Sequence, residues 1–390
     1  MNYDFSKRTN RFNSASMKWD VKENELPMWV ADMDFETAPV IIEAIKKRVD
    51  HRIFGYNIVP DEFFSSIAYW WEKYHNFKMK NEWMMFCTGV VPAISSIVRK
   101  MTTVGENVLI QSPVYNIFYN SIINNGRHIL SSDLVYDGKE YYIDFEDLES
   151  KLSNPQTTMM ILCNPHNPIG KVWDKDTLKK IGELCYKHNV LVVSDEIHCD
   201  LTAPGCEYTP FASVSEECFN NSITCIAPTK AFNIAGLQTS CIVVPNERLR
   251  CKVNRGINTD EVAEPNSFAI IAAVAAFTEG REWLEELRIY IEENKILFKN
   301  YIKENIPELY VIPSDATYLL WIDCSKISED TEFLCEFIRE KTGLYVTEGK
   351  EYGINGKKFI RINLACPQER MMDGAERLKK GVELFVKNNN

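Results

Sequence analysis

The sequence lacks several patterns that would place the protein in a specialised class. No apolar run approaches the roughly 20 residues that a membrane-spanning helix needs. The first residues, MNYDFSKRTNRFNS, contain neither the apolar core nor the cleavage site of a secretory signal. Low-complexity stretches, long charge blocks and obvious repeats are also missing. We therefore expect a cytoplasmic protein.

Acidic residues outnumber basic ones. The 44 Lys and Arg residues against 55 Asp and Glu give a formal net charge of −11. Nucleic acids and anionic membranes bind basic surfaces, so this balance argues against both as partners. The 12 cysteines contain no C-x-x-C pair, and no cluster of Cys and His has zinc spacing. We expect no metal site, and cysteines that are small buried residues in a reducing compartment.

Common catalytic motifs are missing as well. The sequence contains no G-x-S-x-G, no H-E-x-x-H and no G-x-x-x-x-G-K-[ST]. The chain nevertheless has 390 residues, of which 45% are apolar and 25% are charged. A chain of this length and composition can bury a large core without disulfides. The sequence therefore predicts an ordinary globular protein whose chemistry must be found elsewhere.

Short aliphatic runs alternate with helical patterns along much of the chain. Such runs, bounded by turn or helix signals, are typical of fully buried parallel strands. An amphipathic helix from Asp174 to His188, which Asp174 can cap, lies between two of them. The pattern predicts an α/β fold with a mostly parallel sheet. The expected strands are 108–110, 158–163, 190–194, 222–227 and 241–244.

The rest of the chain predicts a smaller α+β domain. A long helix is expected over 268–304, broken near Gly280, followed by strands at 317–322 and 358–364 and helices at 332–341 and 371–387. We therefore expect an N-terminal segment (1–45) that joins the small domain, a large domain (46–280) and a small C-terminal domain (281–390).

Polar residues follow three of the predicted strands. Asn167 lies in NPHNPIG, Asp195 in SDEIH and Lys230 in PTKAFN. Ligands in open α/β sheets bind outside the carboxyl ends of the strands, so these three side chains are expected to face one cleft. Taken alone, such an Asp is usually a helix cap and such a Lys is usually solvated. The three together favour a functional site.

A glycine turn precedes the first predicted strand. Thr88-Gly89-Val90-Val91 opens a helix predicted over 92–101, with Pro92 in its first turn. Free amide groups at a helix start bind phosphate well. The motif is weak when taken alone, because many helices begin in this way.

With these motifs in place, the chain resembles a known family along essentially its whole length. NPHNPIG, SDEIH and PTKAFNIAGL are similar to the fold-type I pyridoxal-phosphate enzymes of the class I/II aminotransferase superfamily. The segments WVADMDF (29–35), GVVPAI (89–94) and PTKAFNIAGLQ (228–238) resemble most closely its cystathionine β-lyase branch, the MalY/PatB-type carbon–sulfur lyases. The resemblance implies an aspartate-aminotransferase-like fold, pyridoxal 5′-phosphate as cofactor and a homodimer with active sites at the subunit interface.

The resemblance also implies catalytic and binding roles. Lys230 would form the Schiff base with the cofactor and move the Cα proton, as a buried amine with a lowered pKa can do. Asp195 would pair with the pyridinium nitrogen, so that the ring accepts electrons. Asn167 would hydrogen-bond the 3′-oxygen and Tyr115 would stack on the ring. The phosphate would be bound by Gly89, Val90, Val91 and Thr229.

Four further positions receive roles from the same resemblance. Arg361 would bind the substrate carboxylate with its two-pronged donor set. Ala31 would contribute backbone contacts at the substrate mouth. Tyr56 would reach the cofactor phosphate of the neighbouring subunit. The plainer alternatives are a core aromatic for Tyr115, a surface ion pair for Arg361, packing within the chain for Tyr56, and a buried N-terminal segment for 29–35.

The chain departs from the aspartate-aminotransferase pattern at three positions near the cofactor. Gln238 stands where that pattern has a phosphate-binding Arg, and Ala227 where it has a Ser. His198, which we expect at the cofactor, stands where a Tyr lies near the 3′-oxygen, and this fits the lyase branch. The phosphate should therefore depend more on the helix start, on Thr229 and on Tyr56.

The implied reaction is α,β-elimination on a sulfur amino acid such as cystathionine or cysteine, giving a thiol (homocysteine or sulfide), pyruvate and ammonia. A thiolate leaves readily because the pKa of a thiol is near 8.5. One alternative is an aminotransferase on the same scaffold, because fold does not decide reaction type. Another is a regulatory protein that binds the cofactor and a partner protein.

Overall fold

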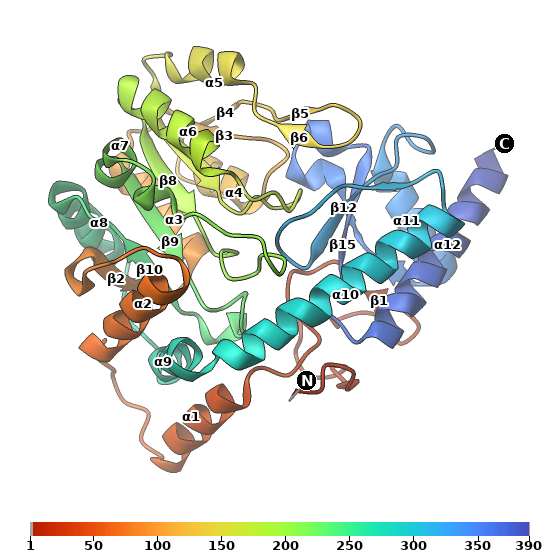
Figure 1. The fold of residues 1–390 in the computed structure, drawn as a ribbon, viewed down its shortest axis with the longest axis horizontal. Helices are drawn as coiled ribbons and strands as arrows, with labels where there is room; N and C mark the ends of the chain where they lie inside the picture. The colour runs from red at the N-terminus through yellow and green to blue at the C-terminus, as the bar shows by residue number, and fades with distance from the viewer. Residues whose placement is uncertain (1–2, 390) are drawn as a thin grey trace.

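A seven-stranded sheet organises the computed structural model, which describes residues 3–389 (Figure 1). All neighbouring strands except β10 pair in parallel. The predicted α/β class and mostly parallel sheet are confirmed. In spatial order the strands are β2 (Met84–Cys87), β10 (Ser240–Val243), β9 (Ser222–Ile226), β8 (Leu191–Asp195), β7 (Thr157–Cys163), β3 (Asn107–Ile110) and β4 (His128–Ser131).

Strand β10 corrects one expectation. The run 241–244 was expected to form a parallel strand, but β10 pairs antiparallel with both β9 and β2. A parallel return needs a crossover of a dozen or more residues, usually a helix that packs on the sheet. Here residues 227–239 form a loop with only a 3-10 turn, η3 (Ala235–Leu237), so the chain turns back directly. That loop carries Lys230.

Helices cover both faces of the large sheet. Adjacent residues of β7 face opposite sides, since Ile161 belongs to one buried cluster and Met160 and Leu162 to another. The first cluster includes α3 (Val90–Met101), α4 (Ile117–Ile123) and α8 (Glu247–Thr259). The opposite face packs against α2 (Asp61–Tyr74), α5 (Phe145–Leu152), α6 (Lys175–Lys187), α7 (Glu216–Asn220) and α9 (Ala269–Glu279), and α1 (Pro39–Asp50) packs on α9.

The helix pattern agrees with the sequence in two informative places. Asp174 caps α6 by accepting a hydrogen bond from the Thr177 amide at 2.8 Å. The predicted break at Gly280 separates α9 from α10 (Arg281–Asn305). A Cβ at Gly280 would lie 2.5 Å from the Ala276 oxygen and 2.5 Å from Phe232 Cε1, so only glycine fits there. Helix α10 then runs across to the second sheet (Figure 1).

The second sheet is small and antiparallel. Its order is β11 (Tyr310–Val311), β12 (Leu319–Asp323), β15 (Phe359–Asn363) and β14 (Thr347–Glu348). Helices α10, α11 (Thr331–Thr342) and α12 (Gln368–Asn389) share its buried cluster. The remaining short elements are β1 (Leu26–Pro27) paired with β13 (Leu344–Tyr345), the β5 (Val135–Tyr136) and β6 (Tyr141–Tyr142) hairpin, and the 3-10 turns η1 (Asn81–Trp83), η2 (Phe211–Ser213), η4 (Gly349–Tyr352) and η5 (Ile354–Gly356).

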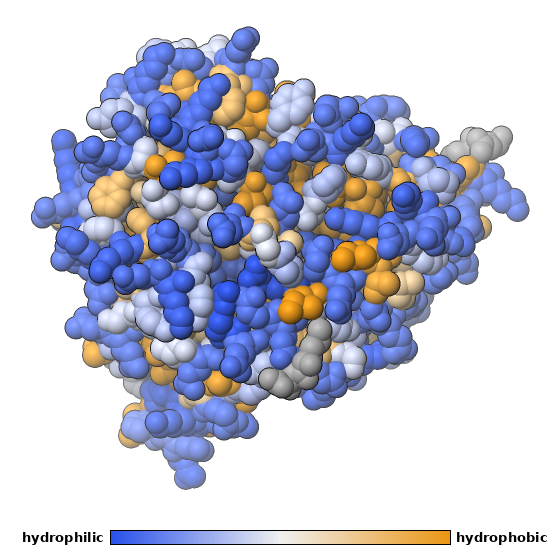
Figure 2. All heavy atoms as spheres, viewed as in Figure 1, coloured by the Kyte–Doolittle hydropathy of each residue, from blue (hydrophilic) through white to orange (hydrophobic). Residues whose placement is uncertain are grey.

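The N-terminal region contacts both the large-sheet part and the small-sheet part of the chain. The pairing of β1 with β13 attaches it to the C-terminal part of the chain, while α1 packs against α9. The division into 1–45, 46–280 and 281–390 stays a prediction. Polar side chains dominate the face shown in Figure 2, with apolar residues scattered among them. Within residues 3–389, every helix is too short or too polar to cross a lipid bilayer.

Candidate active site

A cavity of about 260 Å³ opens where the carboxyl ends of β7, β8 and β9 meet the start of α3. Ten of the residues singled out from the sequence line it: Ala31, Gly89, Val90, Val91, Tyr115, Asn167, Asp195, His198, Thr229 and Lys230. Because parallel strands end at the same edge of a sheet, the loops after β7, β8 and β9 deliver Asn167, Asp195 and Lys230 to one place. The expectation that these three face one cleft is confirmed.

Asp195 is the last residue of β8 and is only 4% exposed. One of its carboxylate oxygens accepts a hydrogen bond from the Ile197 amide at 3.1 Å. No cation within residues 3–389 forms an ion pair with it. Burial, together with the neighbouring Glu196 charge, raises the pKa of Asp195 to about 7, although the Ile197 hydrogen bond and Lys230 act in the opposite direction. The cavity therefore contains a buried carboxyl group that lacks a positive partner.

Lys230 extends from the loop between β9 and β10 into the cavity. Its Nζ donates a hydrogen bond to the Ala31 carbonyl oxygen at 2.6 Å. Desolvation and the positive charge of Arg361 lower the pKa of Lys230 to about 8, against the opposing charges of Asp32 and Asp195. A substantial fraction of the amine is therefore neutral near physiological pH, as a nucleophile or a base requires.

The start of α3 forms the wall opposite these side chains. Gly89 is its N-cap, and no side chain caps the helix. The first amide groups of an α-helix have no partner within the helix. Here they adjoin the cavity at Val90 and Val91, and Thr229 lines the same space. The site thus offers amide donors and the positive end of a helix dipole to an anion.

Aromatic side chains complete the walls. Tyr115 lines the cavity, and burial raises the pKa of its hydroxyl. His198 is also buried, its Nδ1 has no hydrogen-bond partner among the described residues, and burial lowers its pKa to about 3. Its ring meets that of Tyr318 edge-on with centroids 6.5 Å apart. At neutral pH the His198 ring is therefore uncharged.

Arg361 lies on β15, where Ile360 and Ile362 point into the core of the small sheet. The Arg361 side chain is buried, so it does not form a surface ion pair. Its Nη1 donates to Asn167 Oδ1 at 3.3 Å and its Nη2 to the Trp29 carbonyl at 2.8 Å. The buried Nε has no partner among the described residues. The guanidinium thus retains donor capacity beside the cavity.

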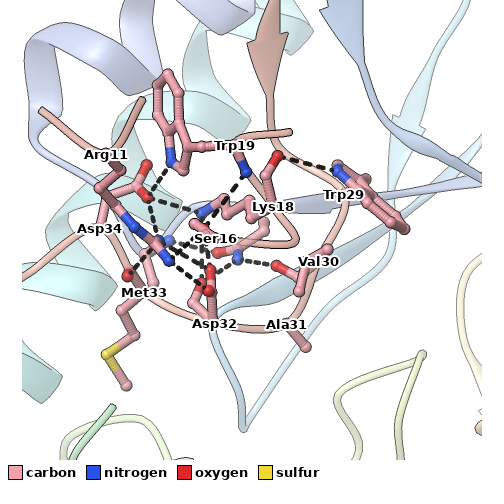
Figure 3. Close-up of polar contacts among 12 residues, drawn as sticks. Arg11, Ser16, Lys18, Trp19, Trp29, Val30, Ala31, Asp32, Met33 and Asp34 are labelled. Carbon is pink, nitrogen blue, oxygen red and sulfur yellow. Dashed lines mark hydrogen bonds and ion pairs between the residues drawn. The ribbon is translucent and has the colours of Figure 1, made fainter. Parts of the chain in front are cut away.

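Residues 29–35, here called the strap, bring Ala31 to the wall of the cavity. Figure 3 shows the polar contacts around this segment. Carbonyl groups of the strap accept hydrogen bonds from Asn363 on β15 and from Asn233 in the loop that carries Lys230. Asn363 Nδ2 donates to Val30 O and Asp32 O, both at 2.6 Å. Asn233, three residues after Lys230, donates to the carbonyls of Met33 and Phe35. The strap is thus fixed to the Lys230 loop and to β15.

Behind the strap lies a group of charged residues, here called the charge cluster: Arg11, Lys18, Asp32, Asp34 and Arg370. Asp34 is 2% exposed and has ion pairs with Arg11 at 2.8 Å, Lys18 at 3.2 Å and Arg370 at 2.9 Å. Arg11 also binds Asp32 at 2.7 Å (Figure 3). Burial alone would raise the pKa of Asp34, but Lys18 and Arg370, with hydrogen bonds from Trp19 and Arg11, lower it to about 2.

One predicted site residue lies away from this cavity. Tyr56 is fully exposed on the segment between α1 and α2, beside a separate hollow formed by residues 54–59 and 263–267. The Tyr56 ring is therefore not packed against the rest of its own chain. A contact with the cofactor of a second subunit stays a prediction.

The sequence reasoning missed several residues of the cavity. Thr239 and Cys163 line it, and Thr239 Oγ1 is buried without a partner among residues 3–389. Tyr318 was also missed, although its hydroxyl donates to the same Ala31 carbonyl as Lys230, at 2.9 Å. Gln238, noted only as a departure, lines the cavity with a left-handed backbone (φ 54°). Small side chains such as Thr239 and Cys163, and one core tyrosine, give no signal in sequence.

Comparison with known proteins places this geometry among characterised relatives. The model of the family described as aminotransferase class I and II matches residues 24–378. Cystathionine beta-lyase PatB of Bacillus subtilis is 42% identical over 383 residues, covering 96% of this chain and 99% of that protein. Protein MalY of Escherichia coli is 31% identical over 380 residues, covering 95% and 97%. The crystal structure of cystalysin from Treponema denticola, which contains pyridoxal 5′-phosphate, superimposes with a TM-score of 0.95 at 34% identity and covers 98% of this chain and 99% of that one.

Proposed function

The chain belongs to the aminotransferase class I and II family, and we propose that it is a pyridoxal-phosphate-dependent carbon–sulfur β-lyase. The observation that carries the proposal is the pair of Lys230 and Asp195 in one cavity. Lys230 provides an amine with a pKa of about 8, and Asp195 is a buried carboxyl group without an ion-pair partner among the described residues. The relatives support the elimination reaction, since PatB is named a cystathionine β-lyase.

The cavity fits the cofactor on several independent grounds. A protonated ring nitrogen is the positive partner that Asp195 lacks, and the uncapped start of α3 suits a phosphate group. The unpartnered His198 Nδ1 and Thr239 Oγ1 are orphaned polar atoms beside the same space. We assign Asp195 to the ring nitrogen, Asn167 to the 3′-oxygen, Tyr115 to the ring face, His198 to the cofactor's surroundings, and Gly89, Val90, Val91 and Thr229 to the phosphate.

When bound, pyridoxal phosphate supplies an aldehyde that captures the substrate amine and a heterocycle that takes up the electrons released when the Cα–H bond breaks. The chain's own residues do the rest. Asp195 keeps the ring nitrogen protonated because a buried carboxylate stabilises a positive charge beside it. Lys230, once released, accepts the Cα proton on Nζ, and the Ala31 carbonyl at 2.6 Å holds that nitrogen at the cavity mouth.

Arg361 is the proposed anchor for the substrate carboxylate. Its guanidinium is held by Trp29 O and Asn167 Oδ1, which leaves Nε free for an anion. The sulfur at Cβ then leaves as a thiolate, and it needs little help from an acid because the pKa of a thiol is near 8.5. Ala31 contributes backbone contact at the mouth. Water then hydrolyses the released enamine to pyruvate and ammonia.

We propose that the active form is a cytoplasmic homodimer. Ile53, Phe54, Tyr56 and Ile58 are all exposed on the segment between α1 and α2, an apolar cluster that would be buried by a second copy of the chain. A second copy would also bring its Tyr56 to the first subunit's phosphate site. Measurement of the molar mass in solution tests the dimer, and a monomer at micromolar concentration would contradict it.

The reaction is tested by an assay without an acceptor. The holoenzyme is incubated with cystathionine, cysteine and a panel of thioether amino acids, with no 2-oxo acid present. We expect pyruvate, ammonia and free thiol in equal amounts. Product that forms only after a 2-oxo acid is added would instead identify an aminotransferase, which the same Lys230, Asp195 and Asn167 could serve.

A further inference from the structure

The end of β8 and the loop that follows it border two different cavities. Asp195, Ile197 and His198 line the catalytic cavity. Cys199 and Asp200, the next two residues, line a second, separate cavity of about 610 Å³. The lining of this second cavity is mainly polar, and it also includes His75, at the C-terminal end of α2. The proposed reaction uses none of these three residues.

His75, Cys199 and Asp200 together present an imidazole nitrogen, a sulfur atom and a carboxylate oxygen. These three atoms all lie within 4.8 Å of one another. His75 Nε2 is 2.9 Å from Asp200 Oδ1, and Trp70 Nε1 donates to that same oxygen at 2.9 Å. The Trp70 contact fixes the carboxylate in the way that outer contacts orient ligands at metal centres.

The carboxyl group of Asp200 supplies an independent indication of a ligand. Its side chain is buried, with the residue only 4% exposed, and its second oxygen, Oδ2, has no hydrogen-bond partner among residues 3–389. A buried carboxylate oxygen without a donor is costly in free energy. The group lies at the wall of the second cavity, so a cation that enters from this side would satisfy it.

We propose that His75, Cys199 and Asp200 bind a divalent transition-metal cation of the zinc class. The set of one nitrogen, one sulfur and one oxygen ligand suits zinc, which prefers four ligands and tolerates this mixture. Thiolate and carboxylate together balance the dication's charge, and the thiol proton is released to solvent on binding. A water molecule from the second cavity is the fourth ligand. Small shifts of the three side chains bring the donors to bonding distance.

The position of this site gives it a structural consequence. Cation binding would tie the C-terminal end of α2 to the loop that carries Asp195 and His198, and so would stabilise the folded chain by mass action. His75 and Cys199 lie far apart in the chain. Their spacing therefore matches no zinc motif.

Equilibrium dialysis of the holoenzyme against Zn²⁺, followed by elemental analysis, tests the proposal. We expect one tightly bound zinc per chain, and an affinity weakened by about 100-fold or more in Cys199→Ser and in His75→Gln. The matched control is Cys206→Ser, because Cys206 lines the same cavity but lies outside the cluster. This control should bind zinc as the wild type does. Absence of tight zinc in the wild type, or equal binding by Cys199→Ser, would overturn the proposal.

A second measurement covers the case in which a variant folds poorly. Co²⁺ added to the wild-type holoenzyme should produce a thiolate-to-cobalt charge-transfer band, read as a difference spectrum so that cofactor absorbance cancels. The midpoint of thermal unfolding should rise with Zn²⁺ in the wild type and in Cys206→Ser. A cobalt spectrum without a thiolate band would remove Cys199 from the site and sink the proposal. The band should be lost in Cys199→Ser and retained in Cys206→Ser.

Discussion

Two buried aspartates show how differently this chain treats the same side chain in two regions. Asp34, behind the strap, is 2% exposed, and Asp195, in the catalytic cavity, is 4% exposed. The pKa of Asp34 is lowered to about 2, whereas that of Asp195 is raised to about 7. Burial pushes both upward, so the difference arises from the surrounding charges. Three cations of the chain surround Asp34, whereas no cation within residues 3–389 forms an ion pair with Asp195.

The carboxylate of Asp34 is paired with cations of the chain, whereas the carboxyl group of Asp195 is available to a ligand. In the charge cluster, cations of the chain pair with Asp32 and Asp34, and these ion pairs tie the strap to Arg11, Lys18 and Arg370. The cavity is electrostatically incomplete, and such incompleteness is typical of functional sites. The same reasoning applies to two buried lysines. Lys230 and Lys295 both have pKa values lowered to about 8, mainly by burial, but only Lys230 lines the catalytic cavity.

Replacing Lys230 should have the largest effect. We expect Lys230→Ala to reduce turnover by about 10⁴-fold or more, since it removes both the group that holds the cofactor and the base. The visible absorbance of the cofactor–lysine linkage should vanish as well. Steady-state pyruvate formation and an absorbance spectrum provide the measurements.

Lys295→Met is the matched control for this variant. It keeps most of the apolar stem of a buried lysine whose Nζ contacts Ser314, Ala316 and Glu292. Activity and colour should stay close to wild type. Retained turnover in Lys230→Ala, or loss of colour in Lys295→Met, would break the distinction between the two lysines.

Replacing Asp195 should have the next largest effect. In Asp195→Asn the amide cannot keep the ring nitrogen protonated, so we expect kcat to fall by roughly 100- to 1000-fold, the scale of one lost preorganised electrostatic contact. Asn has nearly the same shape as Asp, so the folded structure should persist. Steady-state kinetics and circular dichroism together check both statements. A kcat within a factor of a few of wild type would remove Asp195 from the proposed role.

Replacing Asp34 should affect stability rather than chemistry. Its pKa falls from 3.8 to about 2 on folding, which corresponds to about 2 kcal/mol of stability. Because the folded value is the lower one, this stability is present above about pH 4 and is lost as the pH falls towards 2. We expect Asp34→Asn to lower the free energy of unfolding by about 2–4 kcal/mol at pH 7, since it also leaves cations unpaired. Urea denaturation measures this.

Asp195→Asn in the cofactor-free protein should change stability in the opposite direction. The folded pKa of Asp195 is the higher one, so its carboxyl group costs stability progressively between about pH 4 and pH 7 and most above pH 7. The Asn variant should therefore be more stable than the wild type at pH 8 and equally stable at pH 4. If Asp34→Asn and Asp195→Asn changed the free energy of unfolding in the same direction and by the same amount, the proposed difference between the two regions would be wrong.

The sequence predicted the cavity better than the charge cluster for a physical reason. Asn167, Asp195 and Lys230 each follow a buried strand, and parallel strands necessarily bring their carboxyl ends together. Arg11 and Lys18 follow no such rule, and Arg370 meets Asp34 only after the two ends of the chain have packed together. Tyr318 was missed for the same reason, whereas Thr239 was missed because a small polar residue gives no signal in sequence.

The remaining differences also come from long-range packing. The direction of β10 depended on whether residues 227–239 formed a helix, and they form a loop. His75 approaches Cys199 and Asp200 only because α2 packs beside the loop after β8. Periodicity and local motifs thus predicted most elements and the main catalytic set, whereas contacts between distant segments needed the structure.

Arg361 joins the two regions, and its replacement should have the smallest of these effects. Nη2 contacts the strap at Trp29 O and Nη1 contacts Asn167 in the cavity, so part of its binding capacity is already used. We expect Arg361→Ala to raise KM by about 10- to 100-fold, the loss of a hydrogen-bonded charge pair, while the cofactor absorbance remains. Arg361→Lys keeps the charge without the two-pronged geometry and should recover only part of the affinity. An unchanged KM in Arg361→Ala would confine Arg361 to holding the strap, and the substrate carboxylate would then need another partner.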